Sequence, residues 1–120
     1  MSYIVRTGNL AGVPTLRHGD RGAYTYARVI VSDRIKDGDN YVDGPSTAYD
    51  VAINGQPAES LVATATENGN IRVTFSGDYQ VSQYTPEEGE PRIVHNVRAD
   101  EIAVSLRGQA VSVEPWKSQA

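Results

Sequence analysis

Histidine, the side chain most often used for acid–base catalysis and zinc binding, occurs at only two positions in this sequence. His18 lies in a turn-like region beside Arg17, whereas His95 lies in a segment that alternates like a strand. Two histidines so placed form no recognisable ligand set, and position 95 favours a hydrogen-bonded structural histidine. The sequence contains no cysteine, which excludes disulfides and thiolate metal sites.

The acidic residues do not suggest a metal site either. Asp37, Asp39 and Asp43 alternate somewhat like a calcium loop, but the glutamate needed at the twelfth position is missing. The chain has no Gly-x-Ser-x-Gly elbow, no phosphate-binding glycine loop and no His-Glu-x-x-His motif. We therefore predict a protein that is not an enzyme and that uses no metal and no cofactor.

The distribution of charge is more informative than its sum. The net charge is −4, which argues mildly against a nucleic-acid partner. Residues 1–36 nevertheless carry six cations and two acids, a local +4, while residues 37–71 carry six acids and no cation. A positive groove could thus lie on an acidic molecule; equally, these charges could simply solvate an ordinary surface.

The elements that must position these side chains are mostly strands. In residues 24–31, small or apolar residues at odd positions alternate with Tyr24, Tyr26, Arg28 and Ile30, which predicts a strand with the odd positions facing a core. Similar alternation predicts inward positions at Tyr49, Val51 and Ile53, at Ile71, Val73 and Phe75, and, less clearly, at Ile93, His95 and Val97.

Turn-forming residues separate these strands. Residues 36–45 (KDGDNYVDGP) and 86–91 (PEEGEP) predict polar loops. Residues 57–67 predict a short helix, because Pro57 suits a first helical turn and Asn68-Gly69-Asn70 would end it. Leu61, Val62 and Ala65 would form its apolar side.

The resulting order is three strands, a short helix and two strands, which predicts an all-β, five-stranded OB-fold barrel with one helix between strands 3 and 4. We expect residues 1–108 to form this domain and residues 109–120 to be a short flexible tail. With no secretory signal and no long apolar run, we expect a cytoplasmic protein with no membrane partner.

Residues 8–17 (GNLAGVPTLR) and residues 99–107 (ADEIAVSLR) resemble two segments of the bacterial single-stranded DNA-binding protein family. The first is similar to the family's G-N-L-G-x-D-P-E-L-R segment. The second is very close to the A-D-E-I-x-x-S-L-R ending of its barrel, particularly in actinobacterial versions. Between them, the resemblance places the start of the fourth strand at Arg72, its end at Gly77, and a last-hairpin G-E-x-R motif at residues 89–92.

The resemblance implies sequence-independent binding of single-stranded DNA in replication, recombination and repair, by a homotetramer at the nucleoid. Family members place tryptophan or phenylalanine at four positions; this chain has Ile35 or Lys36, Ala48 or Tyr49, Asn54, and Tyr84 there. Tyrosines would replace some of these rings, or would serve only as strand formers. The nucleic-acid-binding residues implied in this way are Tyr24, Tyr26, Arg28, Arg34, Lys36, Tyr41, Arg72, Tyr84 and Arg92.

The sequence also departs from the family. Members usually end in an acidic tip that recruits replication proteins, whereas this sequence ends in VEPWKSQA and has no acidic tip: either the recruitment role is absent or the gene product was trimmed. Acidic residues near the expected binding face motivate an alternative: a family-like paralogue with weakened DNA binding that acts as a protein-interaction or hetero-oligomerising module. An oligosaccharide-binding barrel is a weaker third possibility.

Overall fold

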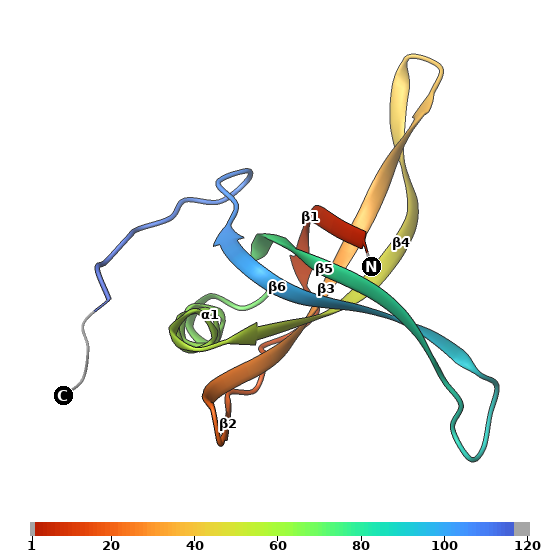
Figure 1. The fold of residues 1–120 in the computed structure, drawn as a ribbon. Coiled ribbons are helices and arrows are strands. Elements are labelled where there is room, and N and C mark those ends of the chain that lie inside the picture. The colour runs from red at the N-terminus through yellow and green to blue at the C-terminus, as the bar shows by residue number, and fades with distance from the viewer. Residues whose placement is uncertain (1, 117–120) are drawn as a thin grey trace.

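The computed structural model describes residues 2–116 and contains six strands and one helix (Figure 1). The predicted tail therefore lies partly outside the described residues, at positions 117–120. The elements follow the order β1 (Ser2–Leu10), β2 (Arg17–Gly19), β3 (Gly22–Asp37), β4 (Asn40–Asn54), α1 (Gln56–Asn68), β5 (Arg72–Tyr84) and β6 (Arg92–Val104).

The strands form one sheet that closes into a barrel. Its order is β1-β5-β6-β4-β3-β2, and an additional pairing between β1 and β3 joins the ends. All pairings are antiparallel except that of β4 with β6. Apart from the three-residue β2, the strands number five, with α1 between the third and the fourth. The predicted all-β OB-fold barrel is confirmed.

The core follows the predicted alternation. Along β3, Thr25, Ala27, Val29 and Val31 are buried, and the residues between them are not. The same holds for the predicted inward residues of β4 and β5. Phe75 is completely buried near the centre of this core, where its ring packs 5.5 Å from that of Tyr49.

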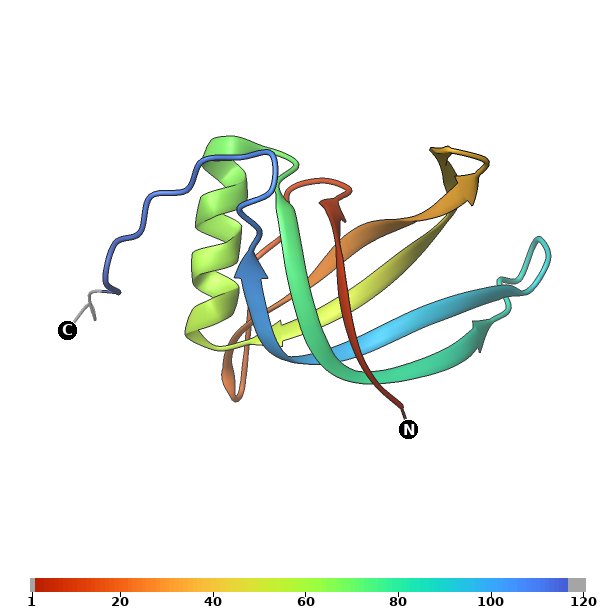
Figure 2. The ribbon, with the colours of Figure 1, turned by 90° about the horizontal axis from the view of Figure 1, so that it is seen from above.

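Helix α1 lies at one end of the barrel (Figure 2), close to the predicted bounds. Gly55 precedes it with φ of 78°, Pro57 lies in its first turn, and Gly69 with φ of 81° ends it. Ala58, Leu61 and Ala65 are buried against the barrel, whereas Val62 is only half-buried.

Two hairpin arms extend from the opposite end of the barrel and diverge (Figure 2). We name them by their residues: the 32–46 arm of β3 and β4, and the 80–95 arm of β5 and β6. The predicted polar loop at 36–45 is wrong, because β3 and β4 continue through it and only Gly38 and Asp39 form a turn. The second Asp-Gly pair instead lies at an irregularity, where the register shifts between Ser32 and Arg34.

The second arm corrects two further expectations. Strand β5 does not end at Gly77 but runs on to Tyr84, with a register shift between Ser76 and Gly77. Only glycine fits there, since a Cβ atom would overlap the backbone of Arg98. Ile93 does not face the core: it lies on the 80–95 arm beyond the barrel and is 66% exposed.

Candidate nucleic-acid interface

The outer face of β3, β4, β6 and β5 is one continuous polar surface. The strand register sets Arg28 opposite Asp50, Asp50 opposite Asn96, and Asn96 opposite Gln80. Residues directly opposite each other point to the same side of a sheet, so this row crosses all four strands on one face. The neighbouring row consists of Tyr26, Ala52, Arg98 and Asp78.

Three of the predicted site residues lie on the part of β3 that belongs to the barrel body rather than to an arm. We call Tyr24, Tyr26 and Arg28 the β3 group. The two tyrosine rings pack edge to face with centroids 5.9 Å apart, and Tyr26 remains 61% exposed. The Arg28 Nε donates to the Asp50 carboxylate at 3.2 Å. Arg17, which the sequence interpretation did not include, lies opposite Tyr24 on β2 and belongs to the same surface.

The 32–46 arm brings together three more of the predicted residues. Lys36 lies opposite Tyr41, whose side chain is 60% exposed, and Arg34 lies opposite Asp43. A ring and an ammonium group therefore lie side by side near the tip of this arm. The acid opposite Arg34 reduces the positive charge that the arm presents.

The 80–95 arm carries the corresponding pair near its own tip. Tyr84 lies opposite Arg92, and the guanidinium carbon of Arg92 is 5.4 Å from the centroid of the tyrosine ring. Tyr84 is 51% exposed. Such a cation–π contact orients both groups while leaving the ring accessible from one side.

Arg72 is the one predicted site residue that the structure does not bring to these groups. It begins β5, opposite Asn9, and lies twelve positions before Tyr84, which is about 40 Å of extended strand. Its Nε is buried without a hydrogen-bond partner, and Gln109 binds its backbone N–H and carbonyl oxygen. Arg72 thus lies at the far end of the strand from Tyr84.

The family ring positions are correspondingly poor in rings here. Tyr49 is 6% exposed and packs in the core, so it offers no surface to a base. Ala48 and Asn54 are exposed but not aromatic, and Ile35 lies beside the cation Lys36 in the 32–46 arm. Of the positions where the family carries rings, Tyr84 alone presents an exposed ring.

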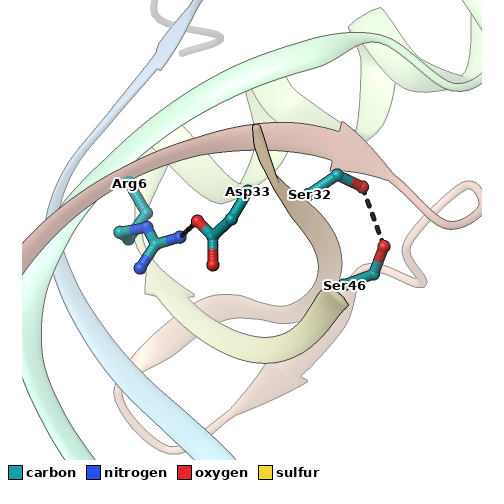
Figure 3. A network of polar contacts seen from close by, with 4 residues as sticks. All are labelled: Arg6, Ser32, Asp33 and Ser46. Carbon is teal, nitrogen blue, oxygen red and sulfur yellow. Dashed lines mark hydrogen bonds and ion pairs between the residues drawn. The ribbon is translucent and has the colours of Figure 1, made fainter. Parts of the chain in front are cut away.

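Polar contacts connect the strands on both faces of the sheet where the arms leave the barrel. The Arg6 guanidinium pairs with the Asp33 carboxylate at 2.6 Å, and the Ser32 and Ser46 hydroxyls are 2.8 Å apart (Figure 3). His95 Nδ1 is 2.6 Å from the Tyr79 hydroxyl, with the two rings stacked. The predicted structural role of His95 is confirmed.

Within residues 2–116, no three histidine, cysteine, aspartate or glutamate side chains are grouped so as to hold a metal ion. Over the same residues, no helix has the length and apolar character needed to cross a membrane.

Comparison with known proteins gave no matching protein-family model and no matching curated protein. Among solved structures, the chain is similar to a small single-stranded DNA-binding protein from Streptomyces coelicolor, with a TM-score of 0.73 and 25% sequence identity. The match covers 88% of this chain and 94% of that one. The resemblance that the two end motifs indicated is confirmed at the level of structure.

Proposed function

We propose that this protein binds single-stranded DNA without regard to sequence, on the outer face of β3, β4, β6 and β5. The observation that carries the proposal is the repeated pairing of an exposed tyrosine with a cation. It occurs across strands at Tyr41 with Lys36 and at Tyr84 with Arg92, and along β3 the exposed Tyr26 lies two residues from Arg28 on the same face. Stacking of bases on rings and neutralisation of phosphates by neighbouring cations are the two interactions that bind single strands.

The same face carries acids that weaken this interaction. Asp50 pairs with Arg28, and Asp43 lies opposite Arg34. Tyrosine rings in place of tryptophan also give less stacking area to each base. We therefore expect an affinity below that of a family member with all four rings.

Titration of the protein with an oligothymidylate tests the proposal. We expect saturable binding at low salt that weakens as salt is raised. A plot of the logarithm of the binding constant against the logarithm of the salt concentration should have a slope of about −0.7 for each phosphate neutralised. An oligonucleotide of mixed sequence should bind with similar affinity, because stacking does not read base edges. Absence of binding at low salt would reject the proposal.

We further propose that the protein acts as a homotetramer. Residues 2–8 of β1 pair with β5 on one side, whereas β3 pairs with β1 only at Asn9 and Leu10. This leaves an open strand edge, and the side chains of Tyr3 and Val5 on it are 58% and 62% exposed. Open edges pair with other strands, so edge-to-edge pairing would give a dimer and two dimers the tetramer. Light scattering after size exclusion should give four times 13.0 kDa.

In the cell, such a protein would coat single strands during replication, recombination and repair, in the cytoplasm at the nucleoid. The alternative function, a protein-interaction or hetero-oligomerising module, is favoured by the pairing of Arg28 with Asp50 and by the open β1 edge. Co-purification of a second barrel protein without DNA supports the alternative, and tight DNA binding by the pure homo-oligomer counts against it.

A further inference from the structure

A cavity of about 330 Å³ lies between residues 11–15 and the outer face of β3. It exists because β1 and β2 pair with different parts of β3. The pairing with β1 ends at Leu10 opposite Val29, and the pairing with β2 begins at Arg17 opposite Tyr24. The residues between β1 and β2 cross this gap as a loop, and Arg17, Tyr26 and Arg28 complete the wall of the cavity.

The loop is held at both ends. The Ala11 backbone N–H donates to the Arg28 carbonyl oxygen at 2.9 Å. At the other end, the buried Thr25 hydroxyl donates to the Thr15 carbonyl oxygen at 2.7 Å. Pro14 is buried between these contacts and has a restricted φ angle. A cavity with fixed walls binds its ligand without the entropic cost of ordering the loop.

The walls define the chemistry of the ligand. Tyr26 offers an exposed ring whose orientation is set by the edge-to-face contact with Tyr24. Asp50 binds the Nε of Arg28 and leaves the terminal nitrogens of that guanidinium for an anion. Arg17 makes no ion pair among the described residues, and no carboxylate lines the cavity. Two guanidinium groups suit a phosphate, and a flat ring suits a base.

We propose that this cavity is a subsite for one nucleotide of a bound single strand, with the base stacked on Tyr26 and its phosphate between Arg17 and Arg28. The inference rests on the proposed function and adds to it a fixed point of attachment. The cavity volume lies at the lower end of the range for ligand pockets, which fits one nucleotide rather than several. Arg17 and the 11–15 loop thereby become part of the binding surface.

Thymidine 5′-monophosphate tests the cavity independently of the rest of the surface. In ¹H–¹⁵N spectra of the full chain, we expect its addition to shift the amide signals of residues 11–17 and 26–28. Inorganic phosphate and thymidine alone should each produce smaller shifts of the same signals. Shifts of equal size with phosphate alone, or shifts spread over the whole surface, would overturn the proposal.

Substitutions then connect the cavity to strand binding. Arg17→Ala and Tyr26→Ala should each weaken oligothymidylate binding at least about fivefold, whereas Tyr26→Phe should retain most of the affinity because it keeps the ring. Arg107→Ala is the matched control, because it removes an exposed arginine outside the cavity. Thermal unfolding of each variant verifies that it is folded.

The outcomes separate the two proposals. If the unsubstituted protein binds no oligothymidylate, the proposed function fails whatever the mononucleotide does. If it binds but Arg17→Ala and Tyr26→Ala bind equally well, the nucleotide subsite alone is wrong. Photocrosslinking of an oligonucleotide that contains 5-iododeoxyuridine should mark Tyr26 or the 11–15 loop. Adducts confined to the two arms would likewise overturn the subsite.

Discussion

The two arms continue four of the strands that form the barrel body, yet the environments of the side chains differ between body and arms. In the body, every second residue of β3 from Thr25 to Val31 is buried, whereas every residue of β3 from Ser32 to Asp37 is exposed. The same change occurs along β5, which is exposed from Gln80 to Tyr84. The hydrophobic effect therefore stabilises the body, and cross-strand pairing stabilises the arms.

This difference divides the proposed binding surface into two kinds. The β3 group is part of the body, and the neighbouring 11–15 loop is held by hydrogen bonds at Ala11 and Thr15. Tyr41 and Tyr84 lie near arm tips with both faces of the hairpin in water. Arms with little buried surface open and bend at low free-energy cost. A single strand of DNA bound to this surface would thus meet one rigid site and two adaptable ones.

The largest expected effect tests the division itself. Phe75→Ala removes a completely buried ring from the body and should lower the free energy of unfolding by about 3–5 kcal/mol. Ile93→Ala on the 80–95 arm removes a side chain that is 66% exposed, so its effect should stay within about 0.5 kcal/mol. Urea denaturation measures both. Similar losses for the two variants would mean that the arm is packed in solution.

Glycines give a second and smaller contrast. Gly77→Ala should cost roughly 1–3 kcal/mol, because the new methyl group would overlap the backbone of Arg98 and the two strands must move apart. Gly12→Ala in the cavity loop should leave stability unchanged, since nothing lies within 4 Å of its added Cβ atom. Denaturation midpoints test the pair. An unchanged midpoint for Gly77→Ala would show that β5 and β6 can move apart at this register shift without loss of stability.

The body was predictable from sequence, and the arms were not. Period-two alternation at residues 25–31 reports burial on one face, so it identified the core side of β3 correctly. On the arms both faces are exposed and no such alternation is needed, so turn residues dominated the interpretation of residues 36–45. Only Gly38 adopts a positive φ there, while Gly44 lies in an irregular part of the strand pairing.

The candidate site shows the same limit. Strand alternation placed Tyr24, Tyr26 and Arg28 together on one outward face, as the structure does. Pairings such as Tyr84 with Arg92 depend on hairpin register, which the length of the intervening loop does not fix. Arg17 was missed because its position depends on β2, a three-residue strand too short for any periodic signal.

The third prediction compares the two kinds of ring directly. Under the proposed function, Tyr84→Ala should weaken oligothymidylate binding by about 1–3 kcal/mol, or roughly 5- to 150-fold, because it removes one stacked base. Tyr84→Phe should keep most of the affinity. Since the arm must become ordered on binding, part of its stacking energy is spent, and we expect Tyr26→Ala to cost more than Tyr84→Ala. A larger loss of affinity for Tyr84→Ala than for Tyr26→Ala, measured at one salt concentration, would contradict a rigid β3 group.

The smallest effect concerns a polar contact on the outer surface of the body. The Tyr3 hydroxyl donates to both oxygens of the Asp100 carboxylate, at 2.9 and 2.8 Å, and the Ser76 hydroxyl donates to one of them at 2.8 Å. These hydrogen bonds, that of Tyr3 foremost, lower the pKa of Asp100 below its ordinary value of 3.8. Because the pKa is lower in the folded state, the contribution to stability is present above pH 3.8 and is lost as the pH falls through the lowered pKa.

Tyr3→Phe should therefore raise the pKa of Asp100 toward 3.8, and Ser76→Ala should raise it less, since Tyr3 is the larger cause. Carboxyl ¹³C shifts followed from about pH 6 down to about pH 2 give both values. If neither substitution moved the titration, the Tyr3 side chain would be as loosely held in solution as those near the arm tips. Only the buried side chains of the body would then be fixed in position, and the rigidity of the β3 group would depend on the hydrogen bonds at Ala11 and Thr15 alone.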